Sequence, residues 1–237
     1  MKYTPHLRRA AALLLALTLL SGTALAKPLN QYTDHSAIQY NAARYANPTE
    51  YLGALQRISD LGIMGANASY DDGELLTRAE LMTALITFMN GFPLPQGTVD
   101  SLKFFDSPFT DVTPDKWYYS HILYAHATKL TNGVGGGRMN PEGRVPYIQA
   151  LLAIMNLLGN RSERSGLAYE RLSIIVFAHK QFNLVRDFLP RDEAALTRGE
   201  LAVLFSYALE AVPITYDKDD RILQSGKTHG QSVFKLP

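Results

Sequence analysis

The hexapeptide Leu-Thr-Arg-Ala-Glu-Leu at residues 76–81 returns at residues 196–201 as Leu-Thr-Arg-Gly-Glu-Leu, 120 residues later. Each copy opens an apolar stretch with helical spacing. In both copies a Thr stands three residues before a Glu, which is the capping-box pattern, and the flanking leucines fit a hydrophobic staple. The sequence therefore predicts that Thr77 with Glu80 and Thr197 with Glu200 begin two helices. Their recurrence indicates an internal repeat.

The arginine of each hexapeptide is not explained by helix initiation. A cation in the first helical turn opposes the helix dipole by a few tenths of a kcal/mol, yet Arg78 and Arg198 both occupy that position. A guanidinium beside exposed backbone N–H groups would suit an anionic ligand. A surface salt bridge would explain the same two residues, and the sequence leaves both interpretations open.

Residues 1–26 have the pattern of a secretory signal peptide. Three basic side chains precede an apolar run at residues 10–20, and Ala24-x-Ala26 follows as a cleavage site before Lys27. The apolar run is short for a membrane span, and no later stretch is longer and comparably apolar. We therefore expect a secreted protein with no transmembrane span after signal cleavage.

Composition limits the possible partners of the mature chain. Without residues 1–26, 20 Lys and Arg face 22 Asp and Glu, so the net charge is about −2. This balance argues against a nucleic-acid partner, and an anionic ligand would have to be held by local arginines. The chain has no Cys, so its core must stabilise it without disulfides.

The repeated unit is predicted to be a helix, a glycine-containing loop and a capped helix. Apolar spacing predicts helices over 51–61 and 77–89 in the first copy and over about 115–129 and 146–158 in the second. The third copy is expected over 167–209. In the second copy Pro146 replaces the capping Thr and Tyr147 replaces the Arg. We expect linkers at 92–106 and 159–165, and a possible strand at 233–236.

These motifs resemble the S-layer homology (SLH) family, whose repeat reads roughly F-x-D-V, W, G-I-x-x-G, G-x-F-x-P and T-R-A-E. The match rests on Phe109-x-Asp111-Val112, Trp117, Gly62-Ile63-x-Gly65, Gly137-x-Met139-x-Pro141, residues 77–80 and residues 197–200. Behind the signal peptide at 1–26, the resemblance implies repeats at 27–91, 109–159 and 167–210, the third degenerate. A C-terminal tail at 211–237 remains.

The resemblance further implies a mainly α fold in which three helix-loop-helix repeats form a pseudo-threefold bundle. In this family, grooves between repeats bind anionic, often pyruvylated, secondary cell-wall polymer. The candidate ligand-binding residues so implied are Arg78, Arg198, Trp117, Asp111, Glu80 and Glu200. The second repeat departs from the pattern at Tyr147, and the third lacks the F-x-D-V and Trp opening. A loop Asp that caps and a Trp that fills the core are the alternatives for Asp111 and Trp117.

The expected function is therefore non-covalent binding to secondary cell-wall polymer or peptidoglycan, which would anchor the protein at the cell wall or cell surface. The alternative is a structural envelope or S-layer-associated protein that acts by self-association. The sequence has no H-E-x-x-H, no G-x-S-x-G and no Cys nucleophile, so we do not expect an enzyme. We also expect no cofactor, no metal and no nucleic acid.

Overall fold

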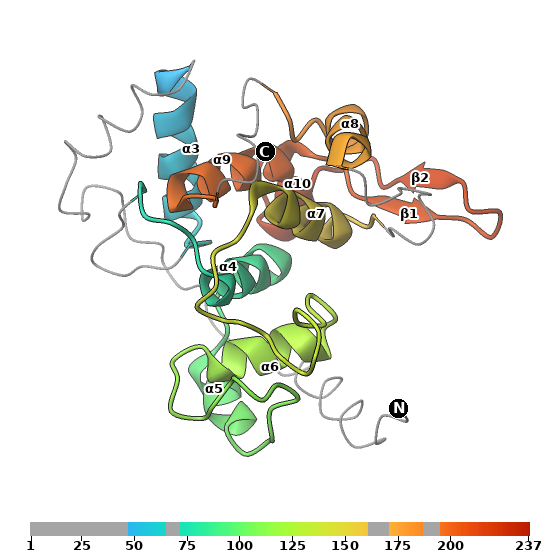
Figure 1. Ribbon diagram of the computed structural model, residues 1–237. Coiled ribbons are helices and arrows are strands. Elements are labelled where there is room, and N and C mark those ends of the chain that lie inside the picture. Colours follow the sequence, from blue (N-terminus) through green and yellow to red (C-terminus); the bar gives the residue numbers. More distant parts are fainter. Residues whose placement is uncertain (1–46, 65–71, 161–170, 187–194) are drawn as a thin grey trace.

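A computed structural model describes residues 47–64, 72–160, 171–186 and 195–237. Within these ranges the chain is helix-rich and has two short strands, which confirms the predicted mainly α fold (Figure 1). The expected signal peptide at 1–26 and the start of the first repeat lie outside the described residues. The elements are α3 (Pro48–Asp60), α4 (Arg78–Asn90), α5 (Gln96–Leu102), α6 (Tyr119–Ala127), α7 (Tyr147–Leu157), α8 (Arg171–Phe182), α9 (Arg198–Glu210), β1 (Ile214–Tyr216), β2 (Ile222–Gln224) and α10 (His229–Val233).

The segments that lead into α4, α7 and α9 are joined by a closed ring of backbone hydrogen bonds. The N–H of Leu76 donates to the carbonyl of Leu196 (2.8 Å), that of Leu196 to Val145 (2.8 Å), and that of Val145 to Leu76 (3.2 Å). All three side chains are buried, so apolar packing and backbone hydrogen bonds both hold these three segments together. Each ring residue lies just before a helix N-cap, and the three helices therefore start from one centre.

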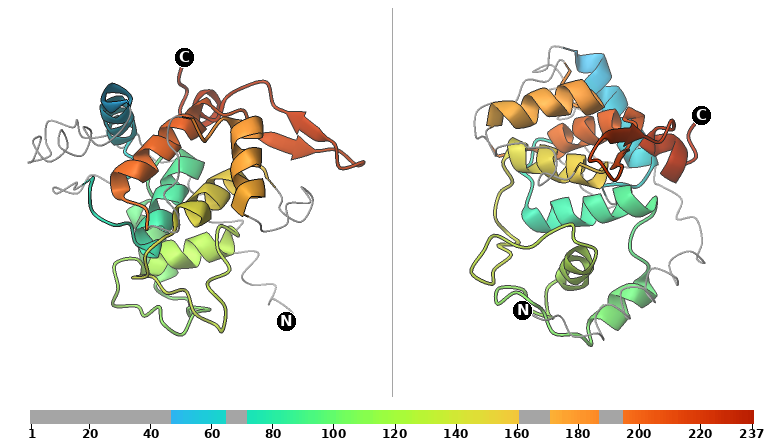
Figure 2. Two further views of the ribbon diagram at one scale, coloured as in Figure 1. Left: turned by 45° about the horizontal axis from the view of Figure 1, so that its top comes forward. Right: turned by 90° about the vertical axis from the view of Figure 1, so that its right-hand side faces the viewer.

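Each of these three helices packs against the helix that precedes a different member of the set. Helix α6, which leads into α7, packs on α4; α8, which leads into α9, packs on α7; and α3, which leads into α4, packs on α9. Figure 2 shows α4, α7 and α9 next to one another with the other helices around them. In the predicted pseudo-threefold bundle, each unit packs on the next unit in the same way, and this cyclic order of contacts is what such a bundle requires. The bundle of three homologous repeats itself stays a prediction.

Helix α9 is the most buried element of the described chain. Every residue from Gly199 to Leu209 is buried, because α3, α7 and α10 all pack against it. Its aromatic side chain Phe205 stacks on Phe88 of α4, with ring centroids 4.7 Å apart. The apolar periodicity of 201–209 therefore reflects a central helix and not a surface one.

Two expectations for the connecting segments are wrong. The segment 92–106, expected to be a linker, contains α5, which begins after Pro95 and packs on α6. The possible strand at 233–236 is wrong because α10 ends at Val233, and the strands of the tail are β1 and β2, paired antiparallel with Thr215 opposite Leu223. This hairpin projects from the helices at the right of Figure 1.

The expected helix boundaries hold to within a few residues, with one clear difference. Helix α6 begins at Tyr119 and not near residue 115, because Thr113 and Lys116 form a turn in which the Lys116 N–H donates to the Thr113 carbonyl (3.1 Å). Helix α4 ends at Asn90, one residue beyond the expected end, and its C-cap Gly91 has a φ of +82° in the left-handed region.

Candidate functional site

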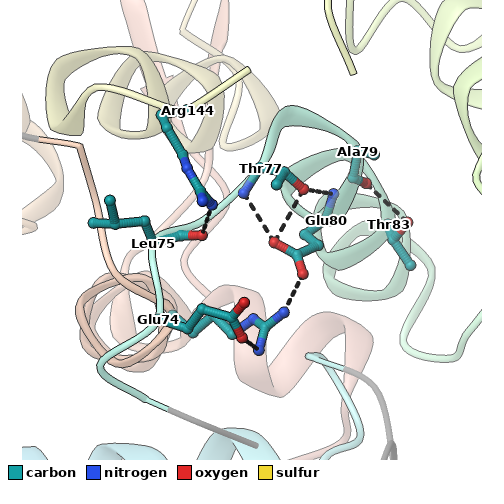
Figure 3. A network of polar contacts seen from close by, with 8 residues as sticks. Glu74, Leu75, Thr77, Ala79, Glu80, Thr83 and Arg144 are labelled. Atoms are coloured by element: carbon teal, nitrogen blue, oxygen red, sulfur yellow. Dashed lines mark hydrogen bonds and ion pairs between the residues drawn. The ribbon is translucent and has the colours of Figure 1, made fainter. Parts of the chain in front are cut away.

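Both hexapeptides form the predicted capping boxes. At α4 the Glu80 N–H donates to the Thr77 hydroxyl (3.3 Å) and the Thr77 N–H donates to the Glu80 carboxylate (2.9 Å), as Figure 3 shows. At α9 the same two bonds join Glu200 and Thr197 at 3.2 and 2.9 Å. The capping role of these four residues is confirmed. Their predicted ligand contact is not tested by this geometry.

The backbone N–H groups beside the two arginines already have partners. At both helix starts the first two N–H groups donate to carbonyls of the loop that precedes another helix. The bonds are Arg78 to Gly143 (3.0 Å), Ala79 to Pro141 (2.9 Å), Arg198 to Glu74 (2.9 Å) and Gly199 to Asp72 (2.9 Å). An anion at these positions would therefore have to be bound by side chains, and the expectation of exposed N–H donors is wrong for these four groups.

Arg198 forms an internal ion-pair cluster. One of its terminal nitrogens pairs with Glu74 and the other with Glu80, so the α9 arginine is tied to the loop and the first turn of α4. Burial would raise the pKa of Glu80, but the Thr77 N–H and the Arg198 guanidinium outweigh it and lower that pKa. Of the two interpretations left open for this residue, the structure shows a salt bridge at Arg198.

Arg78 has no such neighbours. Its side chain is half-buried, and no ion pair or side-chain hydrogen bond joins it to any residue in the described ranges. Its Nε atom is fully buried without a hydrogen-bond partner there, and burial lowers the pKa of the guanidinium. A desolvated cation without a counterion is costly. Arg78 is therefore the candidate residue that an external anion would stabilise most.

Tyr147, which stands where an Arg was expected in the second unit, is a core residue. It is buried, and burial followed by the nearby charge of Glu200 raises the pKa of its hydroxyl. Glu200 is itself only 6% exposed. The start of α7 thus presents a neutral phenol beside a buried carboxylate, which does not favour an anionic ligand.

Asp111 has a structural role of the kind proposed as the alternative to ligand binding. Its carboxylate accepts hydrogen bonds from the N–H groups of Met139 (2.8 Å) and Asn140 (2.7 Å). Burial opposes ionisation, but these N–H groups outweigh it and lower the pKa of Asp111. The residue therefore holds the loop before α7, the loop that supplies the carbonyls for the N–H groups of α4.

Trp117 does not fill the core. Its side chain is 58% exposed, and its ring lies edge-on to Tyr118 with centroids 5.4 Å apart. Burial, followed by the charge of Glu142, raises the pKa of Tyr118 to about 12. An exposed indole at the start of α6 remains available for a ligand, and the core alternative for Trp117 is wrong.

Several residues of this region were missed by sequence reasoning. Glu74 precedes the first hexapeptide by two residues without a motif of its own, and Arg144, which donates to the Leu75 carbonyl (Figure 3), lies between two motifs. The Tyr51 hydroxyl donates to the buried Asp72 carboxylate (2.5 Å). These contacts join residues far apart in the sequence, so no local pattern reports them.

The difference between the two hexapeptides, Ala79 against Gly199, has a steric cause. A Cβ on Gly199 would lie 1.9 Å from the Tyr51 hydroxyl and 3.1 Å from the Asp72 Cβ. The Tyr51–Asp72 pair thus occupies the space that Ala79 fills at α4. Glycine at this position is required by a close approach and not by backbone conformation.

Within the described ranges, no helix combines the length and apolarity needed to cross a membrane. In the same ranges, His, Asp and Glu side chains do not gather in any group of three that could hold a metal ion.

Comparison with known proteins relates part of this chain to a known domain and the chain to bacterial surface proteins. The S-layer homology domain matches residues 108–151. A cell surface protein of Thermoanaerobacter kivui is 25% identical over 181 residues, 76% of this chain and 22% of the relative. A middle cell wall protein of Brevibacillus brevis is 24% identical over 157 residues (65% and 14%), and a surface layer protein of Brevibacillus choshinensis is 26% identical over 107 residues (44% and 9%). The chain thus matches less than a quarter of each relative's length. The chain therefore contains a segment at residues 108–151 that is similar to the S-layer homology domain, and its relatives are proteins of the cell surface and the cell wall.

Proposed function

We propose that this chain binds non-covalently to an anionic polymer of the cell wall through Arg78, and that this contact anchors it at the bacterial cell surface. The S-layer homology domain and the surface-protein relatives support cell-surface anchoring in general and a location at the cell wall or surface. The identity of the polymer is part of the proposal. A secondary cell-wall polysaccharide with pyruvyl carboxylates is the ligand that the family resemblance implies.

The observation that carries the proposal is that Arg78 forms no ion pair with any residue in the part of the chain that the structure describes. The Arg78 guanidinium is half-buried, and its Nε has no hydrogen-bond partner among the described residues. Such a guanidinium binds a carboxylate more strongly than an exposed one does, because part of its hydration is already lost. The exposed Trp117 supports the proposal with an aromatic face on which a sugar ring could stack. The described ring of helix starts supports the threefold bundle in which such grooves would form.

The test is co-sedimentation of the purified chain with cell-wall sacculi. We expect wild type to pellet with sacculi, and Arg78→Ala to bind about 10-fold more weakly, as for a lost hydrogen-bonded charge pair. Arg221→Ala is a matched control, because Arg221 is exposed beside β2 and loses the same charge. Circular dichroism checks folding of each variant.

Two further arms separate the alternatives. Sacculi stripped of polymer by mild acid should no longer bind the chain. Retained binding would indicate that the partner is peptidoglycan. Sedimentation of the chain without sacculi would favour the self-association alternative. Equal binding of the folded Arg78→Ala variant and wild type would contradict the proposal.

A further inference from the structure

The two arginines occupy equivalent places, which allows their surroundings to be compared residue by residue. The N–H of Arg198 donates to the carbonyl of Glu74, and the N–H of Arg78 donates to the carbonyl of Gly143. Each acceptor lies three residues before the N-cap of the next helix start in the ring. Gly143 therefore occupies, beside Arg78, the position that Glu74 occupies beside Arg198.

The same comparison applies to the second carboxylate that holds Arg198. Glu80 is the third residue of α4, and the third residue of α7 is Gln149. Arg198 of α9 pairs with Glu80 of α4. The same rotation relates Arg78 of α4 to Gln149 of α7, which stands at the position equivalent to Glu80. The two carboxylates that pair with Arg198 therefore correspond to two uncharged residues, Gly143 and Gln149, at the equivalent positions for Arg78.

We call a junction the place where the first turn of one of these helices meets the loop and first turn of the next. We propose that the α4–α7 junction binds the anion, because Gly143 and Gln149 leave Arg78 without a carboxylate. At the α9–α4 junction, Glu74 and Glu80 pair with Arg198 and exclude the same ligand. This inference rests on the proposed function and names the residues that select the competent groove. The ligand takes the place of the missing side-chain carboxylates, so it supplies anionic oxygens of a carboxylate or a phosphate.

The third junction, between α7 and α9, disfavours an anion for a different reason. There Tyr147 takes the place of the arginine, and the buried Glu200 takes the place of Glu80. A phenol beside a carboxylate offers an anion no cation and one like charge. The three junctions consequently differ in charge, although the backbone around them repeats.

Loss of binding is tested by restoring one acidic residue. Gln149 is exposed, and Gln149→Glu changes its charge with little change in shape. We expect this variant to bind sacculi about 10-fold more weakly than wild type. Gln224→Glu in the exposed strand β2 is the matched control and should bind like wild type.

Gain of binding is tested in the Arg78→Ala background. Adding Glu74→Gln and Glu80→Gln frees Arg198 while the Gln side chain can still accept the cap hydrogen bond. We expect the triple variant to recover sacculus binding relative to Arg78→Ala. Competition by oligogalacturonate against polyphosphate separates a carboxylate ligand from a phosphate ligand.

The outcomes distinguish the two proposals. If wild type binds and Arg78→Ala does not, but folded Gln149→Glu binds like Gln224→Glu, the selection by Gly143 and Gln149 is wrong while the anchoring proposal stands. If wild type does not bind sacculi, both fail. If the triple variant unfolds, the Gln149→Glu comparison alone decides.

Discussion

The starts of α4 and α9 are nearly identical in sequence and opposite in electrostatic state. Both have Thr-Arg-x-Glu capping boxes with closely similar hydrogen bonds. Arg198 is neutralised by two carboxylates, whereas Arg78 has no counterion among the described residues and a buried, unpartnered Nε. The difference lies in the neighbouring loop and helix. The residues that the adjoining unit places beside each arginine therefore decide whether its charge is neutralised by described residues of the chain.

The largest effect should come from the residue that distinguishes the two motifs. Gly199→Ala would push a Cβ to 1.9 Å from the Tyr51 hydroxyl, which must displace the Tyr51–Asp72 hydrogen bond and leave the buried Asp72 carboxylate poorly paired. We expect the free energy of unfolding to fall by about 3 kcal/mol. Urea unfolding measures it.

Ala79→Gly at α4 is the control for that substitution. It reverses the same exchange in a helix start without the Tyr51–Asp72 pair, and it should cost only about 1 kcal/mol by helix propensity. Equal losses for the two variants would show that the close approach at Gly199 does not decide the residue type.

The arginines themselves should separate stability from binding. Arg198→Ala removes both ion pairs and leaves Glu74 near Glu80, so we expect a loss of about 1–2 kcal/mol in the free energy of unfolding. Arg78→Ala removes a half-buried cation that has no counterion among the described residues, so it should lower the free energy of unfolding by no more than about 0.5 kcal/mol. Thermal unfolding of both variants measures the difference, and a larger loss for Arg78→Ala would reverse the assignment.

Acid should weaken the α9 to α4 contact. The pKa of Glu80 is lowered in the folded protein, so its contribution to stability is present above the unfolded pKa of about 4.3 and is lost as the pH falls through the lower folded value. We expect the acid-induced drop in melting temperature below about pH 4.3 to be shallower in Arg198→Ala than in wild type. Arg78→Ala should keep the wild-type slope, and identical slopes in all three proteins would contradict the coupling.

Local patterns predicted the parts of this site that local chemistry determines. The capping boxes at Thr77 and Thr197 needed only the spacing of Thr and Glu. A third box, Thr228 with Gln231 at the start of α10, has the same spacing and was missed in a tail where only a possible strand was expected. Helix α5 was missed because it has only seven residues, follows Pro95 and includes Gly97, so its apolar residues are too few to show a helical period.

The charge state of each arginine could not be predicted in this way. Glu80 and Arg198 are 118 residues apart, and their pairing depends on the ring of Leu76, Val145 and Leu196. The two hexapeptides could be matched with each other from their residues alone. The equivalence of Gly143 and Glu74 could not be predicted from the sequence, because each of these residues lies in the loop of one unit and contacts the first helical turn of another unit.

The smallest expected effect is also the most direct test of that equivalence. If Gln149 faces Arg78, Gln149→Glu should form a new ion pair and stabilise the protein by about 0.5 kcal/mol, as partly exposed pairs do. In an Arg78→Ala background the same substitution should give no gain. A double-mutant cycle by urea unfolding isolates the interaction between the two positions. A coupling energy near zero would mean that position 149 does not face Arg78, and the neutral surroundings of this arginine would then need a different origin.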